Sequence, residues 1–284
     1  YQGLSSPGLT CYLNSVLQVL FMTEEFREAV KRFGTSSLSY ILKEAKSKPY
    51  SDDNYVFSAC LQQEPYDVYK VISKRLMDDK VFEQRDAAEY FEKILCRTNP
   101  NASEHLIVLY LKIFKGELNH KTTCLNCKMT NDSTNFFWVL PLSMGDSKSR
   151  SYSVLKGWSS FFQAQRVSKD NQMFCSGCNQ KHDADIEYEM IHCPDVLTLL
   201  LKRFSFDYQQ NRYVKLHCRV DVAQTLEVKQ YIYTYSVSAS LYFNLMYDLY
   251  AVVHHFGDLM GGHYTADVKS FETGNWYCFN DNTV

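Results

Sequence analysis

Apolar residues recur at helical spacing in the first third of the chain. A nearly unbroken apolar run predicts a helix over residues 11–20, and Thr23 is a candidate N-cap for a second helix. Residues 67–77 and 86–95 each carry apolar positions three and four apart, which favours two further helices. The sequence Asn99-Pro100-Asn101 interrupts this pattern and ends the predicted helical region.

Beyond residue 100 the period changes, and short runs of β-branched and aromatic residues are separated by turn residues. Strands are predicted over 113–118, 136–142, 185–190, 196–206, 231–237, 242–246, 250–256, 264–269 and 276–279. A polar loop is expected over 145–153 and a short helix over 159–165. Helices followed by strands argue for an α+β fold. The first helix should pack against the late strands, with a cleft between a helical lobe and a β lobe.

The 284 residues suffice for one large domain or two small ones, and an apolar fraction of 45% supplies a packed core. The net charge is −2 with acids and bases interspersed, so the chain offers no basic surface for nucleic acid. No apolar run is long enough to cross a bilayer, and the first residues do not form a signal peptide. They are typical of mid-domain sequence, so we expect an excised segment of a longer protein.

Four of the ten cysteines form two Cys-x-x-Cys pairs, Cys124 with Cys127 and Cys175 with Cys178. Without a secretory signal, such pairs favour metal binding over disulfides, and therefore a reducing compartment, the cytosol or the nucleus. Four thiolates are the ligand set of structural Zn²⁺, which leaves no open position for a reacting water. An iron–sulfur cluster and four reduced cysteines without a metal are the alternatives, although nothing nearby indicates redox chemistry.

Cys11 opens the first predicted helix, directly after the glycine-containing stretch 3–10. Unpaired N–H groups and the positive dipole end converge at a helix N-terminus and favour a reactive thiolate. For a single cysteine the alternative is a small buried hydrophobe. Near the other end, Gly261-Gly262-His263-Tyr264 supplies an imidazole, and Asn280 and Asp281 supply an amide and a carboxylate. Together these residues are the inventory of a Cys-His-Asn/Asp hydrolase.

These stretches resemble a known family, the ubiquitin-specific proteases. Residues Gly3-Leu4 and Gly8-x-Thr10-Cys11-Tyr12-Leu13-Asn14-Ser15 are similar to its cysteine box, and Tyr250 to Gly257, Gly261 to Ala266 and Trp276 to Val284 to its histidine box. Gln84-Arg85-Asp86-Ala87-Ala88-Glu89-Tyr90 resembles the internal Gln-Asp-Ala-x-Glu-Phe motif, and Leu201-Lys202-Arg203-Phe204 a strand motif. The two Cys-x-x-Cys pairs sit where the family has zinc-bearing fingers. The matches follow the same order and cover almost the whole chain.

The resemblance implies a papain-like α+β fold in one catalytic domain, residues 1–284. Its subdomains would be a helical thumb at about 1–104, mainly β fingers at 105–192 and a mainly β palm at 193–284. The implied reaction is hydrolysis of the isopeptide or peptide bond after the C-terminal Gly-Gly of ubiquitin. The partners would be ubiquitin or a ubiquitin-like modifier and its conjugates, and the domain would be monomeric, without nucleic acid or membrane.

By the same resemblance, Cys11 is the nucleophile and His263 the general base. Asn280 would hold the imidazole in its working tautomer, and Asp281 is the fallback candidate. His255 matches a family position as a supporting or core residue.

The resemblance also assigns substrate contacts. Asp86 and Glu89 would face the arginine-containing tail of the modifier, since their spacing puts both carboxylates on one helix face. An ordinary solvated acidic face is the alternative. Gly261, Gly262 and Tyr264 would form part of a narrow channel that admits only two glycines.

One position departs from the family pattern. Five residues before the nucleophile the family has an asparagine that helps bind the oxyanion, and this chain has Ser6. A serine hydroxyl can donate but is shorter, and the loss of one such donor costs about a hundred- to a thousandfold in rate. The backbone N–H of Cys11 should still serve, so we expect a slower enzyme.

Four functions compete at this point. A thiol isopeptidase acting on ubiquitin leads, and a peptidase for a ubiquitin-like modifier with the same Gly-Gly tail is the second enzyme hypothesis. A weakly active or inactive modifier-binding module is kept open by Ser6. A purely structural zinc domain would leave the Cys11 and His263 constellation unexplained.

Overall fold

The computed structural model describes residues 1, 3–4, 6, 8–27, 85–96, 113–145, 150–207, 209, 211–232, 241–259 and 261–284. The helix predicted over 67–77 and the break at 99–101 lie outside these described residues. The chain divides into two compact units, one of Tyr1–Ile113 with Tyr250–Val284 and one of Phe114–Leu249. The division into thumb, fingers and palm stays a prediction.

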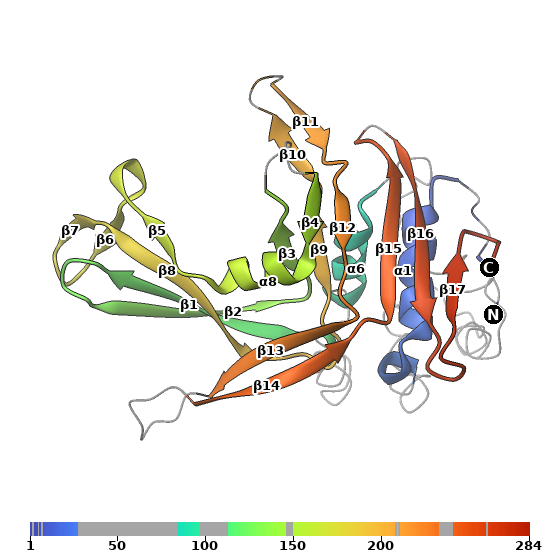
Figure 1. Ribbon diagram of the computed structural model, residues 1–284, viewed down its shortest axis with the longest axis horizontal. Coiled ribbons are helices and arrows are strands. Elements are labelled where there is room, and N and C mark those ends of the chain that lie inside the picture. The colour runs from blue at the N-terminus through green and yellow to red at the C-terminus, as the bar shows by residue number, and fades with distance from the viewer. Residues whose placement is uncertain are drawn as a thin grey trace, which may run out of the picture. The chain divides into compact units, whose positions relative to one another are not determined.

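The first unit packs the N-terminal helix of the chain onto its C-terminal sheet (Figure 1). Helix α1 spans Cys11–Met22, and the antiparallel strands β15 (Ala251–Gly257), β16 (Gly262–Lys269) and β17 (Trp276–Phe279) form the sheet in that order. Ten of the twelve residues of α1 are buried, as expected for a helix that is apolar on nearly all sides. Its packing on β16 confirms the prediction that this helix covers the late strands.

Alternation along β16 separates the core from the polar groups of this unit. Ala266 and Val268 are fully buried and pack with Met22 of α1 and Phe279 of β17. Since successive side chains of a strand point to opposite faces, His263 lies on the face away from this core. The buried residues Ala266 and Val268 therefore fix the strand that carries His263, the predicted base.

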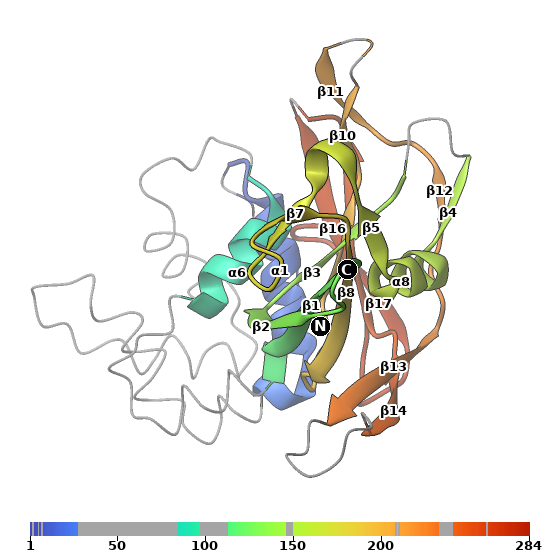
Figure 2. The ribbon, with the colours of Figure 1, turned by 90° about the vertical axis from the view of Figure 1, so that its left-hand side faces the viewer.

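Helix α6 (Ala87–Cys96) lies beside α1 (Figure 2). The rings of Tyr12 in α1 and Tyr90 in α6 pack with their centroids 4.7 Å apart. The helical spacing predicted for this segment is confirmed, since it places these residues of α6 in the core: Ala87, Tyr90, Phe91 and Leu95.

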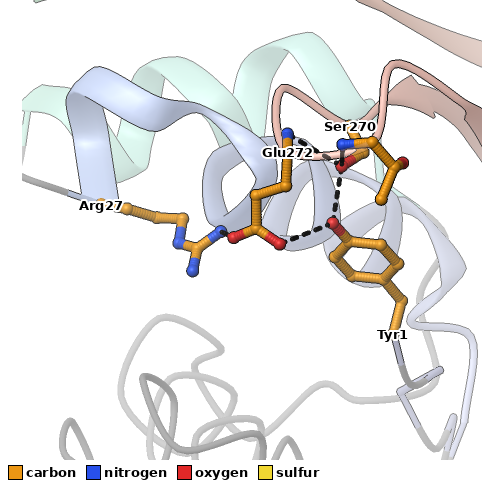
Figure 3. A network of polar contacts seen from close by, with 5 residues as sticks. Tyr1, Arg27, Ser270 and Glu272 are labelled. Carbon is orange, nitrogen blue, oxygen red and sulfur yellow. Dashed lines mark hydrogen bonds and ion pairs between the residues drawn. The ribbon is translucent and has the colours of Figure 1, made fainter.

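The first residue of the chain is fastened to the turn between β16 and β17 (Figure 3). The hydroxyl of Tyr1 lies 2.6 Å from Oγ of the buried Ser270 and donates to the carboxylate of Glu272, 3.3 Å away. Arg27, just after α1, forms an ion pair with the same carboxylate at 3.3 Å. The two ends of the polypeptide are thus held together within this unit.

The second unit is built on a four-stranded antiparallel sheet in the order β2-β1-β8-β5. These strands are β1 (Gly116–Cys124), β2 (Thr130–Phe137), β5 (Gln165–Val167) and β8 (Ala184–His192). The other elements are β3 (Leu140–Ser143), β4 (Ser151–Ser153), α8 (Val154–Phe162), a 3₁₀ turn (Lys169–Asn171), β6 (Met173–Cys175), β7 (Gln180–His182), β9 (Leu199–Lys202), β10 (Phe204–Asp207), β11 (Arg212–Lys215), β12 (Arg219–Asp221), β13 (Thr225–Ile232) and β14 (Leu241–Asp248). Strands β3 and β9, and β4 and β12, pair in parallel, whereas β6–β7, β10–β11 and β13–β14 are antiparallel pairs.

Two predicted strands are interrupted in this unit. The segment 136–142 bends at Trp138 and Val139, so that β2 ends before the bend and β3 begins after it, in a different sheet. The segment 196–206 divides in the same way at Arg203, between β9 and β10. Trp138 and Val139 are themselves buried, at 7% exposure each, so the apolar pattern continues through the bend and conceals it.

Other elements begin or end at different residues than predicted, because hydrogen bonding between strands outweighs the strand preference of individual side chains. The strand predicted over 113–118 begins only at residue 116 and continues through polar residues to Cys124, since β1 is hydrogen-bonded on both sides. The helix predicted over 159–165 overlaps α8, which begins five residues earlier and ends at Phe162, and residue 165 already belongs to β5. Strand β4 lies within the segment predicted as a loop over 145–153. Among the described residues, no helix has the length and apolarity needed to cross a bilayer.

Candidate active site

Cys11 is the first residue of α1, and its sulfur meets a strand from the far end of the chain. The backbone N–H of Tyr264 in β16 donates a hydrogen bond to Cys11 Sγ, with 3.4 Å between nitrogen and sulfur. Only 5% of Cys11 is exposed. The predicted nucleophile is therefore in contact with the residue that directly follows the predicted base, His263.

The charge state of Cys11 is set mainly by burial. Burial raises the pKa of the Cys11 thiol, and the negative charge of Asp281 adds to the rise. The N–H group of Tyr264 and those of the first turn of α1 lower it, but they do not outweigh burial. The N–H groups at the start of α1 thus act on Cys11 in the expected direction, but burial opposes them and is the larger effect. A raised pKa favours the thiol form of Cys11, so a base must take its proton before the sulfur can attack.

His263, at the start of β16, is oriented by Asn280, which directly follows β17. The distance between Nε2 of the imidazole and the side-chain oxygen of Asn280 is 2.6 Å. An amide oxygen only accepts, so Nε2 carries the proton of the neutral ring and Nδ1 is left as the basic nitrogen. The structure thus joins the predicted base to the residue predicted to hold its tautomer.

Asp281, the fallback candidate, has a different partner. Its carboxylate accepts a hydrogen bond from Nδ2 of Asn14 in α1, at 2.8 Å. Asn280 bonds to the imidazole, whereas Asp281 bonds to the helix that carries Cys11. Sequence reasoning missed Asn14, although a lone amide inside an apolar helix is a signal of a buried polar partner.

The hydroxyl of Ser6 forms its hydrogen bonds within its own loop. It donates to the backbone oxygen of Gly8 at 2.8 Å and lies 3.0 Å from the hydroxyl of Thr10. Since a hydroxyl has one hydrogen, Thr10 must be the donor in the second bond. The hydroxyl hydrogens of Ser6 and Thr10 thus both form hydrogen bonds within this loop, and neither is available to an oxyanion in this conformation.

Asp86 and Glu89 each have a partner on or next to α6. Asp86 directly precedes the helix, and its carboxylate accepts a hydrogen bond from the backbone N–H of Glu89 at 3.0 Å, as an N-cap does. Glu89 forms an ion pair with Lys93 one turn later. Both carboxylates are exposed, so they are accessible to a ligand, and their predicted contact with the modifier's arginines stays a prediction.

Gly261 and Gly262 lie where the turn after β15 enters β16. Gly261 is exposed, and its N–H donates to the carboxylate of Asp258 at 3.2 Å. Gly262 has no room for a side chain, because an added Cβ would lie 2.2 Å from the backbone oxygen of Phe256 and 2.3 Å from Nε2 of His255. Packing alone therefore requires glycine at position 262.

Tyr264 connects the nucleophile to the start of α6. Its backbone N–H contacts Cys11, and its ring packs on that of His255 with the centroids 4.7 Å apart. Burial raises the pKa of Tyr264 to about 12, with the charge of Asp86 adding to the rise and the N–H of Ala87 opposing it. The phenol is therefore neutral and lies close to the residues predicted to bind the modifier's tail.

Four cysteines of the second unit form a cluster. The sulfur atoms of Cys124, Cys127, Cys175 and Cys178 all lie within 4.8 Å of one another, with Cys124 and Cys178 at 3.9 Å and Cys127 and Cys175 at 3.5 Å. Four sulfurs that share one Zn²⁺ at the usual bond length are about 3.8 Å apart. The cluster therefore has the dimensions of a metal site. As predicted, it joins two separate hairpins, β1–β2 and β6–β7.

Local backbone geometry prepares this cluster for anionic sulfur. Lys128 and Asn179, each directly after the second cysteine of a pair, have φ values of 60° and 52°. The tight turn lets backbone N–H groups, that of Cys127 first, lower the pKa of Cys124 to about 7. Nδ2 of Asn126 also donates to Cys178 Sγ at 3.4 Å. N–H donors around the sulfurs are typical of thiolate sites that hold a metal.

Comparison with known proteins decides the family. The sequence profile described as "Ubiquitin carboxyl-terminal hydrolase" matches residues 2–284. The chain belongs to the ubiquitin carboxyl-terminal hydrolase family. This membership confirms the resemblance found in the cysteine and histidine boxes.

Similar members of the ubiquitin carboxyl-terminal hydrolase family differ in length. Ubiquitin carboxyl-terminal hydrolase 47 of Drosophila melanogaster is 28% identical over 358 residues, with 100% of this chain and 22% of the relative covered. The corresponding figures for ubiquitin carboxyl-terminal hydrolase 47 of Homo sapiens are 27%, 356 residues, 100% and 25%. Ubl carboxyl-terminal hydrolase 18 of Homo sapiens is 26% identical over 295 residues, with 99% and 76% covered. The chain spans about a quarter of the length of the first two relatives.

Two solved structures share the fold of this family member. The structure of the SAGA Ubp8/Sgf11/Sus1/Sgf73 DUB module bound to ubiquitin aldehyde has a TM-score of 0.76 and 23% identity, covering 100% of this chain and 65% of that chain. A second structure of this module, with a substituted form of Ubp8 and bound to monoubiquitin, has a TM-score of 0.75 and 22% identity, covering 100% and 64%. The prediction of the α+β fold of this protease family is confirmed.

Proposed function

We propose that this chain is a deubiquitinating thiol isopeptidase that hydrolyses the bond after the C-terminal Gly-Gly of ubiquitin. The observation that carries the proposal is the convergence of Cys11, the His263–Asn280 pair and Tyr264 within one unit, from opposite ends of the chain. Family membership and two structural relatives bound to ubiquitin or its aldehyde support it.

The first chemical step is acylation of Cys11. Nδ1 of His263 takes the thiol proton, and Sγ forms a bond to the carbonyl carbon of the terminal glycine while the π electrons move onto the carbonyl oxygen. Because burial raises the pKa of Cys11 and so favours the thiol, this transfer precedes or accompanies attack. Asn280 stabilises the imidazolium by accepting the Nε2 hydrogen.

The remaining steps return the enzyme to its starting state. The oxyanion collapses, the carbon–nitrogen bond breaks, and the departing lysine amine takes the proton from His263. A water then attacks the thioester carbon, gives one proton to His263, and the carbon–sulfur bond breaks. The sulfur regains the proton from His263, so the net reaction adds one water across one amide bond.

A weakly active or inactive modifier-binding domain is the second candidate. The observation that favours it is the Thr10–Ser6–Gly8 chain of hydrogen bonds, which withholds the hydroxyl at the family's oxyanion position. The backbone N–H of Cys11 remains as a donor at the N-terminus of α1. We therefore propose an enzyme with a weakened oxyanion site, which binds modifier normally and turns it over slowly.

We also propose that the four-cysteine cluster holds a structural Zn²⁺. Its spacing and its N–H donors suit four thiolates, and soft sulfur ligands disfavour magnesium and calcium. When bound, the ion would cross-link the hairpins β1–β2 and β6–β7 and take no part in the reaction. The eight cysteines whose side chains the structure describes form no disulfide, which is in keeping with the proposal of a reducing compartment, the cytosol or the nucleus.

The test of the function is reaction with ubiquitin that carries an electrophile at its C-terminus. We expect a covalent adduct at Cys11, located by mass spectrometry and absent from the Cys11→Ala variant. Cys278→Ser is the matched control, since this exposed thiol lies on β17 and should not affect labelling. Failure of ubiquitin to label Cys11, with labelling by another Gly-Gly modifier, would support the ubiquitin-like specificity instead. Binding of ubiquitin without labelling would support the inactive module.

A further inference from the structure

The carboxylate of Asp281 is bonded to the helix that carries the nucleophile. Nδ2 of Asn14 lies 2.8 Å from Oδ1 of Asp281 and 3.3 Å from the backbone oxygen of Leu4. Asn14 follows Cys11 by three residues in α1, so the two positions are neighbours on the helix surface. Asn14 is only 2% exposed, which makes its hydrogen bonds costly to lose.

The backbone of Asp281 is fastened by the N-terminal segment as well. Its carbonyl oxygen accepts a hydrogen bond from the N–H of Leu4 at 2.7 Å. Gly3 packs so closely that an added Cβ would lie 2.2 Å from the carbonyl carbon of Asn282 and 2.4 Å from the backbone oxygen of Asp281. Asp281 has a φ of 48°, a left-handed conformation that a non-glycine residue keeps only where its surroundings hold it.

Asn280 takes its orientation from this anchored turn. Its backbone N–H and C=O groups bond to those of Thr283 at 2.9 and 3.0 Å, which closes the turn around Asp281. Because the peptide bond between Asn280 and Asp281 is planar, a change in the backbone of Asp281 would rotate its neighbour. Such a rotation would lengthen the 2.6 Å bond between Asn280 and His263.

We infer that Asn14 is a positioning residue: by holding the carboxylate of Asp281, it fixes the turn that aims Asn280 at His263. This inference rests on the proposed thiol chemistry. The negative charge of Asp281 also raises the pKa of Cys11, second to burial among the effects that raise it, so the position of this carboxylate affects the reacting sulfur. Asn14 thus acts on both reacting side chains without touching the substrate.

The test uses a pair of exchanged residues in the whole chain. Asn14→Asp replaces the amide donor by a second carboxyl group beside that of Asp281. Two carboxyl groups this close raise each other's pKa, so the variants are compared at the highest pH at which the parent is active, where ionisation of both makes them repel. Combining Asn14→Asp with Asp281→Asn restores an amide-to-carboxylate bond with donor and acceptor exchanged. A positioning role predicts loss in the single variant and recovery in the double variant.

The kinetic readout is hydrolysis of ubiquitin with a fluorogenic C-terminal amide. We expect Asn14→Asp to lower kcat about ten- to a hundredfold, because small displacements of reacting groups are that costly. KM should stay within about twofold, since the substrate is not touched. The double variant should regain most of kcat. Folded Asn14→Asp protein with the parent's kcat would overturn the inference, as would a folded double variant that stays as slow as the single one.

The ¹⁵N resonances of the His263 imidazole separate this inference from the proposed function. The parent should show the proton on Nε2, Asn14→Asp should shift population toward the Nδ1–H tautomer, and the double variant should reverse the shift. This pattern in a chain that never reacts with electrophilic ubiquitin would refute the isopeptidase and leave the positioning role standing. An unchanged tautomer in Asn14→Asp would refute the positioning role alone.

Discussion

The hydroxyl of Ser6 donates its single hydrogen to the backbone oxygen of Gly8, 2.8 Å away. This bond turns the side chain toward its own loop, at the position where the family has an asparagine amide. The chain therefore has the residues proposed as nucleophile, base and orienting residue, but in this conformation Ser6 offers no donor to a developing negative charge.

Ser6→Asn should accelerate hydrolysis. An added amide donor at the oxyanion position is expected to raise kcat by up to about a hundred- to a thousandfold, because the loss of one such donor costs that much in other acyl-transfer enzymes. KM should change little, since the oxyanion exists only after attack. The measurement is a steady-state comparison with the same fluorogenic ubiquitin substrate.

Ser6→Ala is the matched control for this prediction. It removes the hydroxyl but adds no donor, so it reports whether the serine itself contributes to the reaction. A loss of about a hundredfold in Ser6→Ala would mean that the hydroxyl rotates to the oxyanion during catalysis. Equal rates for Ser6→Asn and the parent would remove the oxyanion argument.

Asn280 should matter through the oxygen of its side chain. Asn280→Ala leaves Nε2 of His263 without its acceptor, and we expect kcat to fall at least about tenfold because the working tautomer is no longer favoured. Asn280→Asp keeps an acceptor at the same position and should retain more activity than Asn280→Ala. Equal losses in both variants would contradict a role for the 2.6 Å contact.

The pH dependence of Cys11 alkylation should reveal a raised pKa. Burial disfavours the charged thiolate, so the midpoint of the iodoacetamide reaction should lie above that of the same cysteine in the denatured chain. Reduced access slows the reaction at every pH but does not move its midpoint. Mass spectrometry of the Cys11 peptide follows the reaction. A midpoint below that of the denatured chain would instead indicate a preformed thiolate–imidazolium pair with His263.

The sequence allowed most of the site to be predicted, because its residues lie in short motifs. The first helix follows from an apolar run, and the four cysteines follow from their paired spacing. The bend at Trp138 could not be predicted, because buried apolar residues continue through it. The bond between Asn14 and Asp281 joins residues 267 positions apart, and no local pattern encodes such a pair.

The charge state of Cys11 shows a second limit of sequence reasoning. Its place at the start of a helix could be predicted, and that place alone favours a thiolate. Burial depends on what packs over the helix end, which here includes Tyr264, a residue 253 positions later in the chain. The N–H groups at the helix start lower the pKa of Cys11 and burial raises it, and which effect is larger could not be decided without the tertiary structure.

Removal of the proposed zinc should destabilise the chain without altering the residues of the thiol site. We expect one Zn²⁺ per chain by elemental analysis, and chelation or Cys178→Ser should lower the unfolding temperature by on the order of 10 °C. Cys218→Ser is the control, because this described thiol lies outside the cluster. Full thermal stability after complete removal of metal would contradict a structural role.

Asp86 has two possible roles that one substitution can separate. Its carboxylate caps α6 through the N–H of Glu89, and it is exposed where the modifier's tail is proposed to lie. Asp86→Asn keeps a capping oxygen and removes the charge, so the free energy of unfolding should change by only a few tenths of a kcal/mol. If the carboxylate binds a guanidinium, kcat/KM for ubiquitin should fall about tenfold or more, mainly through KM.

Two controls separate the roles of Asp86. Asp86→Ala should show this loss and also about 1 kcal/mol of destabilisation, because the cap is removed. The decisive control changes the substrate: with ubiquitin whose tail arginines are replaced by alanine, parent and Asp86→Asn should react equally. Equal rates with unmodified ubiquitin would leave Asp86 as a helix cap alone.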